Sequence, residues 1–239
     1  QLTVAIKRAR HIALLPYTAE EKLEVKIGSK GFLYILLLLI AYFLIYAIHK
    51  GEIMPQIGFL GPEGTFSQEA LEIYLRDKKG YNQVAFSNMR EILLAVEDGS
   101  IDEAFVPIEN SIEGPINEIL DLIAFDVDLK IKGEAIVTVR QNLMALNNTD
   151  INNIKVILSH PQGIGQCRKY IATNFPNAEV RLLPSTAAAA RLVSEGSEGM
   201  AAIGSEIAAR IYGLDILKRD IQDNDSNATR FVAIGRNDA

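Results

Sequence analysis

Residues 56–68 read QIGFLGPEGTFSQ, and this stretch decides the fold. Residues 57–60 form a short apolar run that is typical of a buried strand, and Gly and Pro follow it. Thr65 then precedes Gln68 by three residues, which is the spacing of a capping box at the beginning of a helix. The stretch therefore predicts a strand that leads directly into a helix, the repeating unit of α/β proteins.

The same strand-to-helix unit recurs along the chain. Further apolar runs predict strands, so that the full set covers residues 57–60, 84–86, 104–108, 155–158, 180–183 and 200–203. Residues that favour helix beginnings follow these runs, with N-cap candidates at Thr65, Asn88, Ser185 and Ser205 and a first-position proline at Pro161. This alternation predicts an α/β fold with mostly parallel sheets.

Two further extended segments divide the succession of strand-to-helix units into two lobes. One covers residues 128–146 and the other covers residues 230–235, and we interpret them as paired strands that cross between the lobes. The first lobe is then expected at about residues 56–131, the second at about 133–223, and a return strand at 229–236. Helix N-termini at the carboxyl ends of the strands present N–H groups and a positive dipole, so we expect a small anionic ligand in the cleft.

Composition excludes several other classes of protein. The 239 residues include 24 basic and 30 acidic side chains, a net charge of −6, and 49% are hydrophobic. This balance is typical of a globular protein and gives no reason to expect nucleic-acid binding. Cys167 is the single cysteine and the three histidines lie far apart in the sequence, so neither an intrachain disulfide nor a metal site is expected.

Residues 1–53 differ in character from the rest of the chain. They hold seven Lys or Arg and four Glu, a net charge of +3, whereas the remainder carries −9. Residues 31–48 are uncharged and predict a membrane-spanning helix and hence a membrane anchor, with a buried helix or a signal-peptide core as alternatives. Met54 is the first methionine, so a natural start there is weighed equally, with the main domain at residues 54–239 in either case.

Several separate motifs carry a resemblance to a known family. In order along the chain they are GPEGTF (61–66), VPIENS (106–111), SHPQ (159–162), STA (185–187), AAIGS (201–205) and NATRF (227–231). Together they make the chain resemble the prephenate dehydratases. The resemblance implies a two-lobed fold like that of type II periplasmic binding proteins, and a cytoplasmic catalytic domain.

The resemblance also implies an activity. Members of the family convert prephenate to phenylpyruvate in phenylalanine biosynthesis, which makes them carbon–oxygen lyases that need no cofactor. The family's usual C-terminal ACT regulatory domain has no counterpart before Ala239, so feedback control by phenylalanine is not expected in this chain.

The chemistry of this reaction assigns roles to the motif residues. The substrate is a dianion that loses a hydroxyl group together with carbon dioxide, so the enzyme must hold two carboxylates and assist the departing hydroxyl. The resemblance points to Thr229 as the catalytic hydroxyl, and Glu109 is the rival proton donor. Arg230 offers a planar fork for a carboxylate.

The remaining candidates are expected to bind substrate or to cap helices. The substrate-binding candidates are Thr65, Asn110, Ser111, Ser185, Thr186, Ser205 and Phe231. His160 is expected to be mainly a helix cap because Pro161 follows it, and Cys167 is expected to be a buried apolar side chain.

Two other functions remain open. An arogenate dehydratase would use a substrate with an ammonium group in place of the keto oxygen, and a non-catalytic module would only bind a small aromatic acid. The oligomeric state also stays open, with a homodimer as one alternative.

Overall fold

The computed structural model describes residues 54–78, 80–196 and 198–236. The chain divides into two units, Gln1–Ile53 and Met54–Ala239, and all the described residues belong to the second unit. The candidate membrane anchor at residues 31–48 lies outside the described residues. Within the described ranges, no helix combines the length and the apolar character needed to cross a bilayer.

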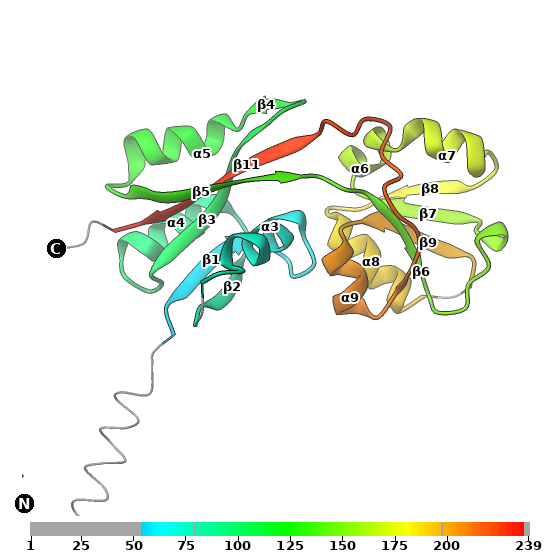
Figure 1. The fold of residues 1–239 in the computed structure, drawn as a ribbon, viewed down its shortest axis with the longest axis horizontal. Coiled ribbons are helices and arrows are strands. Elements are labelled where there is room, and N and C mark those ends of the chain that lie inside the picture. Colours follow the sequence, from blue (N-terminus) through cyan, green and yellow to red (C-terminus); the bar gives the residue numbers. More distant parts are fainter. Residues whose placement is uncertain (1–53, 79, 197, 237–239) are drawn as a thin grey trace, which may run out of the picture. The chain divides into compact units, whose positions relative to one another are not determined.

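The first lobe is built on a sheet with the order β2-β1-β3-β11-β5 (Figure 1). Its strands are β2 (Asn82–Phe86), β1 (Gln56–Leu60), β3 (Glu103–Asn110), β11 (Ala228–Gly235) and β5 (Lys130–Thr138), and the short β4 (Gly114–Pro115) pairs with β3. Helix α3 (Phe66–Leu75) packs on one face, where Leu71 contacts the apolar cluster around Phe105. Helices α4 (Met89–Glu97) and α5 (Asn117–Asp121), followed by the π-helical turn Leu122–Asp126, cover the other face.

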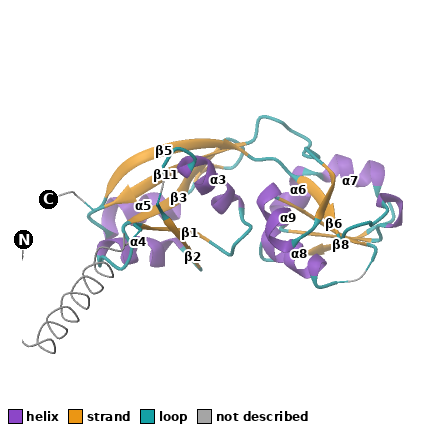
Figure 2. Ribbon diagram, turned by 60° about the horizontal axis from the view of Figure 1, so that its bottom comes forward, coloured by secondary structure: helices purple, strands orange, loops and turns teal. Residues whose placement is uncertain are grey.

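The second lobe has a five-stranded sheet with the order β10-β6-β9-β7-β8. Its strands are β10 (Asp215–Lys218), β6 (Asn142–Ala145), β9 (Met200–Gly204), β7 (Val156–Ser159) and β8 (Glu179–Leu182), and a 3-10 turn (Ile151–Asn153) precedes β7. Helices α6 (Pro161–Gln166) and α7 (Arg168–Asn174) lie on one face, and α8 (Thr186–Ser194) and α9 (Glu206–Tyr212) lie on the other. Figure 2 shows helices on both sides of each sheet.

The expected two-lobed α/β fold and its strand-to-helix units are confirmed. Each of the six predicted strands overlaps an observed one, and each predicted N-cap oxygen accepts a backbone N–H of its own helix. Pro161 begins α6, as expected. Local capping chemistry therefore sets where these helices begin.

The predicted pairing of the two crossing segments is also observed. Strand β5 pairs antiparallel with β11 along its whole length, from Thr138 opposite Ala228 to Lys130 opposite Gly235 (Figure 1). The chain enters the second lobe directly after β5 and returns directly before β11. Because one segment leaves the first lobe and the other returns to it, they must run in opposite directions.

This crossing corrects two expectations. The described sheets are mixed rather than mostly parallel, with four parallel and five antiparallel strand pairs. The first sheet also continues to Thr138, beyond the boundary expected between residues 131 and 133, because β11 holds all of β5 in that sheet.

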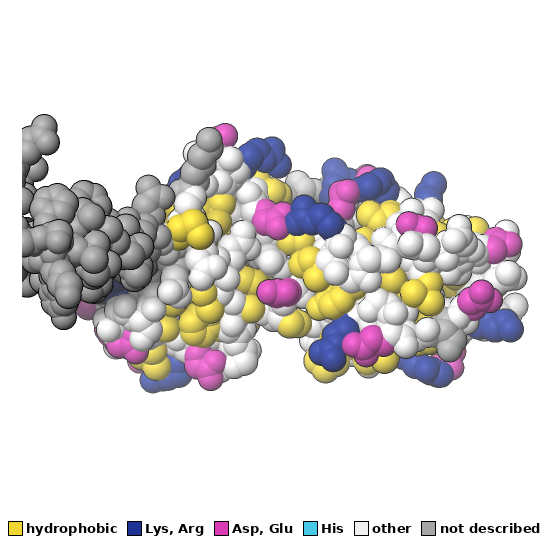
Figure 3. Space-filling view, turned by 90° about the horizontal axis from the view of Figure 1, so that it is seen from below, with side chains coloured by type: hydrophobic (Ala, Val, Ile, Leu, Met, Phe, Trp, Pro, Cys, Tyr) yellow, Lys and Arg dark blue, Asp and Glu magenta, His cyan; other side chains and the backbone are white. Residues whose placement is uncertain are grey.

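The described surface carries charges of both signs. On the face shown in Figure 3, acidic and basic side chains are interspersed among hydrophobic ones. This pattern matches the modest net charge of the sequence.

Candidate active site

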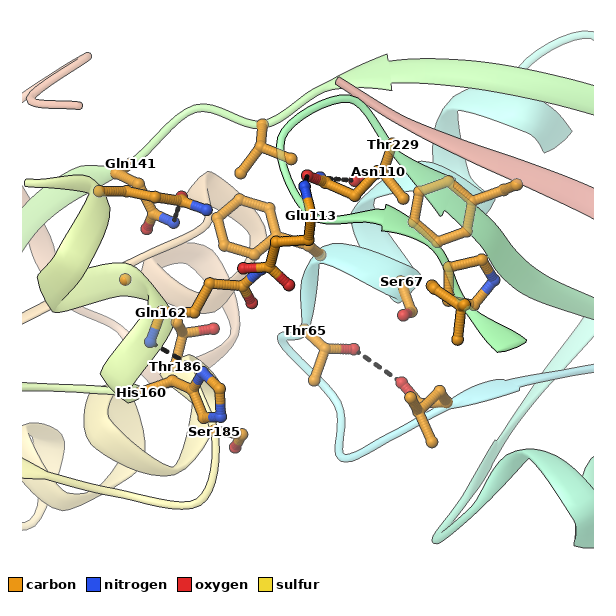
Figure 4. A pocket seen from close by; sticks show the side chains of 18 of the residues that line it. Thr65, Ser67, Asn110, Glu113, Gln141, His160, Gln162, Ser185, Thr186 and Thr229 are labelled. Atoms are coloured by element: carbon orange, nitrogen blue, oxygen red, sulfur yellow. Dashed lines mark hydrogen bonds between the residues drawn. The ribbon is translucent and has the colours of Figure 1, made fainter. Parts of the chain in front are cut away.

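A cavity of about 450 Å³ lies where the two lobes meet (Figure 4). Its walls come from the beginnings of helices α3, α6 and α8, from the ends of strands β3 and β11, and from the segment that joins β5 to β6. Six of the predicted site residues line it: Thr65, Asn110, Ser185, Thr186, Thr229 and Phe231.

The first lobe contributes the beginning of α3. The Thr65 hydroxyl accepts the backbone N–H of Gln68 at 3.4 Å and donates to the carbonyl of Leu60 at 3.0 Å, while the Gln68 side chain accepts the N–H of Gly64 at 2.7 Å. Thr65 therefore caps the helix as predicted, whereas Gln68 reaches back to Gly64, one residue before the N-cap of a standard capping box. The Thr65 side chain is thus engaged within the protein, and α3 offers a ligand the positive end of its dipole.

The second lobe contributes the beginning of α8. The Ser185 hydroxyl accepts the N–H of Ala188 at 2.9 Å, which places Ser185 and Thr186 at the cavity wall. The N-termini of α3 and α8, one from each lobe, therefore border the same cavity. Such an arrangement suits a ligand with a negative group at each end.

Thr229 and Asn110 face each other across the β3–β11 pair. The Asn110 amide donates to the Thr229 hydroxyl oxygen and to the Asn227 side-chain oxygen, each at 2.9 Å. Asn110 also accepts the backbone N–H groups of Ile112 and Glu113 at 2.9 and 3.1 Å. Because the Thr229 oxygen accepts this hydrogen bond, its own proton is available to a group in the cavity.

Phe231 forms an apolar part of the wall. Its ring stacks on Phe105 with centroids 5.3 Å apart and planes 5° from parallel, and its side chain is almost fully buried. Phe231 therefore belongs both to the core of the first lobe and to the cavity.

Arg230 and Glu109 do not line the cavity, so the structure gives no support to the roles expected for them. The two residues are register partners on neighbouring strands, and the Arg230 Nε atom lies 4.0 Å from the Glu109 Oε2 atom. Their side chains are 44% and 53% exposed. Successive residues of a strand point to opposite faces, so Thr229 faces inward and Arg230 outward.

Ser111 and Ser205 also lie outside the cavity wall. The Ser111 hydroxyl is exposed, donates to the carbonyl of Ser226 at 3.0 Å and accepts the N–H of Ala228 at 2.9 Å. Ser205 is fully buried, caps α9 and donates to the carbonyl of Gly64 at 2.8 Å. Both side chains hold segments of the chain together.

Several lining residues were not predicted as site residues. The Gln162 amide donates to the Glu113 carboxylate at 2.5 Å, and the Gln141 amide donates to the Gln166 side-chain oxygen at 2.9 Å. Gln162 ends the SHPQ motif and Gln166 follows it, so both could have been found there. Glu113 and Gln141 lie in a turn and in a segment between the lobes, where the sequence gives no signal.

His160 and Cys167 occupy the places that the sequence predicted. The His160 ring caps α6 by accepting the N–H of Gln162 at 3.3 Å, and the ring also lines the cavity. Cys167 is fully buried, and burial raises the pKa of its thiol to about 12. At neutral pH the sulfur is therefore a protonated, inert side chain.

The charge of the wall sets a limit on ligand chemistry. Among the described lining residues there is one carboxylate, that of Glu113, and there is no Lys or Arg. Negative groups of a ligand would therefore be held by N–H groups, amides and hydroxyls rather than by cations.

Comparison with known proteins identifies the family. A family model described as prephenate dehydratase matches residues 57–239. The chain belongs to the prephenate dehydratase family. The expected resemblance is thereby confirmed, and the cavity lies within the matched residues.

Curated relatives and solved structures agree with this family. The bifunctional chorismate mutase/prephenate dehydratase of Buchnera aphidicola is 36% identical over 79% of this chain and 49% of its own length. The prephenate dehydratase of Lactococcus lactis subsp. cremoris is 34% identical over 76% of this chain and 63% of its own length. The crystal structure of prephenate dehydratase from Arthrobacter aurescens, in complex with L-Phe, is 35% identical with a TM-score of 0.69 and covers 77% of this chain and 60% of that one. The chain thus spans about half to two thirds of the length of these relatives.

Proposed function

We propose that the described unit is a prephenate dehydratase that converts prephenate to phenylpyruvate, carbon dioxide and water in phenylalanine biosynthesis. The observation that carries the proposal is the Asn110–Thr229 hydrogen bond in a cavity bordered by two helix N-termini. In a member of this family, that arrangement supplies a positioned hydroxyl between two sites for carboxylates.

Binding relies on the two helix N-termini. Prephenate carries one carboxylate on its ring and one on its pyruvyl side chain. We assign one of them to the beginning of α3 and the other to the beginning of α8, where helix dipoles and N–H groups stabilise negative charge. Phe231 offers an apolar surface to the ring.

The reaction breaks two bonds of the bound substrate. The bond from the ring to its carboxylate breaks, carbon dioxide leaves, and the bonding electron pair enters the ring. The ring becomes aromatic as the carbon–oxygen bond to the hydroxyl group breaks. The departing oxygen takes that electron pair and leaves as hydroxide, which takes a proton from solvent to become water. The overall process is a carbon–oxygen lyase reaction.

Thr229 assists the departing oxygen. A threonine hydroxyl is too weakly acidic to act as a free acid, so it acts by donating a hydrogen bond where negative charge develops. Asn110 fixes the direction of that donation because it occupies the acceptor side of the Thr229 oxygen. The enzyme therefore lowers the barrier through preorganised dipoles.

The test is a direct assay of the purified chain. Prephenate is incubated at neutral pH, and phenylpyruvate is followed by its ultraviolet absorbance. Enzyme-dependent formation of phenylpyruvate supports the proposal. Tight binding of prephenate without turnover would instead favour a non-catalytic binding module.

Arogenate is a second candidate substrate, and Glu113 is the observation that favours it. A carboxylate at the cavity wall is a suitable partner for the ammonium group that arogenate carries in place of the keto oxygen. The same assay with arogenate, repeated on Glu113→Gln, separates the two substrates. An arogenate dehydratase would be strongly weakened by this substitution, whereas turnover of the prephenate dianion would be retained or improved.

Two finer proposals concern the whole chain. A membrane anchor at residues 31–48 rests on the apolar sequence there, and fractionation of cells that express the full chain tests it. A homodimer is tested by analytical ultracentrifugation.

A further inference from the structure

The two lobes meet beside the cavity at a contact formed by α3 and the preceding loop on one side and by α9 on the other. Ser205 donates to the Gly64 carbonyl at 2.8 Å, and Tyr212 donates to the Glu63 carbonyl at 3.0 Å. Arg210 donates to both carboxylate oxygens of Glu72 at 2.6 and 2.7 Å. We call these interactions, together with Glu69, the lobe contact.

Glu69 is the unusual member of the lobe contact. It lies on α3, one turn after Thr65, and its Oε2 atom is buried without a hydrogen-bond partner. A buried carboxylate oxygen without a partner is costly when it is charged. Burial raises the pKa of the Glu69 carboxyl to about 7, Glu206 and Glu72 add to the rise, and Arg210 opposes it.

The charged groups that face Glu69 come from two helices, α3 and α9. Its own helix contributes Glu72, which Arg210 of α9 binds. Helix α9 also contributes Glu206, and a hydrogen bond from Arg219 lowers the pKa of its carboxyl. The strand residues packed against the other face of α3, such as Ile57 and Phe105, are apolar.

We propose that Glu69 is a positioning residue that couples docking of the two lobes to proton binding. When Glu69 is neutral, α3 and α9 can approach each other and the lobe contact forms. When Glu69 is ionised, its charge must be removed from water and placed near Glu72 and Glu206, so separation of the lobes is favoured. Because the first turn of α3 borders the cavity, the same proton controls how readily the cavity closes.

The sign follows from linkage. In this proposal, separation of the lobes returns the pKa of Glu69 to its ordinary value of 4.5, whereas in the lobe contact its pKa is about 7. The docked form therefore binds the proton more tightly, and docking weakens as the pH rises from about 4.5 to about 7. Between pH 6 and pH 8, the population with separated lobes should grow roughly tenfold.

The experiment measures hydrogen exchange of the full chain without substrate, so its outcome does not depend on the proposed function. Exchange is followed in residues 61–68 and 205–212 at pH 6 and pH 8 and corrected for the intrinsic effect of pH. The parent chain should lose protection in both segments by roughly tenfold. Glu69→Gln, which mimics the neutral acid, should keep the protection that the parent shows at pH 6.

Two further variants complete the test. Glu69→Leu removes the titrating group in a different way and should also show no loss of protection. Glu103→Gln is the matched control, because the Oε2 atom of Glu103 is likewise buried without a partner but lies on β3, within the first lobe. Glu103→Gln should retain the full pH dependence. The proposal is overturned if Glu69→Gln and Glu69→Leu still lose protection as the parent does, or if the parent itself shows no change.

Discussion

At the scale of single residues, Thr229 is expected to control the chemical step. Thr229→Ala removes a hydrogen bond that is used mainly in the transition state, so kcat should fall by about 10² or more with little change in KM. Steady-state kinetics with prephenate measure both constants. Thr229→Ser keeps the hydroxyl with a freer rotamer and should retain partial activity. An alanine variant nearly as fast as the parent would rule out this role.

Asn110 should affect the same step indirectly, through its hydrogen bond to the Thr229 hydroxyl. Asn110→Ala leaves the Thr229 oxygen without its donor and frees the turn that carries Glu113, so kcat should fall by about 10-fold or more. The buried Asn227 side chain also loses a partner, and the free energy of unfolding should decrease by roughly 1–3 kcal/mol. Kinetics and urea unfolding of the same preparation measure both effects. Full activity with unchanged stability would contradict the positioning role.

Arg230 should matter much less than its place in the TRF sequence suggests. Its side chain is half exposed and lies 4.0 Å from Glu109 on the outer face of the sheet, and exposed ion pairs contribute about 0–1 kcal/mol. Arg230→Ala should therefore change KM for prephenate by less than about threefold. The matched Glu109→Ala should behave alike. A loss of affinity of about 30-fold or more in Arg230→Ala alone would show that the guanidinium reaches the substrate.

At the scale of elements, the loop before α3 depends on a glycine. Gly64 has φ +85°, and a Cβ atom there would lie 3.0 Å from the Tyr212 ring and 3.3 Å from the Ala208 Cα atom. Gly64→Ala therefore combines backbone strain with a clash across the lobe contact and should reduce the free energy of unfolding by roughly 2–4 kcal/mol.

Gly80 provides the control for this substitution. Its φ is +88°, yet no atom lies within 4 Å of the position of an added Cβ atom. Gly80→Ala should cost only the backbone strain, about 1 kcal/mol. Equal losses of stability for the two variants in urea unfolding would show that the lobes are not in close contact at Gly64.

The sequence predicted the elements better than the directions of side chains. Strand runs and caps are local, because the oxygen of Ser185 and the N–H it accepts lie three residues apart. Whether Thr229 or Arg230 faces the cavity depends on the partner strands of β11 and on the register shift after Arg230, which are set by residues far away in the chain. Ser205 was predicted to bind substrate for the same reason. Its hydroxyl instead donates a hydrogen bond to the Gly64 carbonyl in the other lobe, a contact between distant parts of the chain.

At the scale of the whole unit, the first lobe depends on a strand that lies late in the chain. Strand β11 lies between β3 and β5 in the sheet, and Val232 and Ile234 belong to the core of that lobe. A chain that ends after Asp220 keeps every described strand except β11, and it should lose the cooperative unfolding of the first lobe. The m value, which is the slope of the unfolding free energy against denaturant concentration, should fall by about half because only the second lobe then unfolds cooperatively.

A chain that ends after Arg236 serves as the comparison, because it keeps β11. It should unfold with the same m value as the chain that includes all of residues 54–239. If the shorter chain unfolds with the same m value, β11 is dispensable for the first lobe.

The position of β11 also has a consequence for folding while the chain is being synthesised. As the polypeptide leaves the ribosome, all described strands of the second sheet, between residues 142 and 218, emerge before residues 228–235. The second lobe can therefore complete its sheet while the earlier-made first lobe still has an open slot between β3 and β5. The facing edges of β3 and β5 are templates for wrong pairing until the late strand arrives, so this interval is when the nascent chain most needs a chaperone.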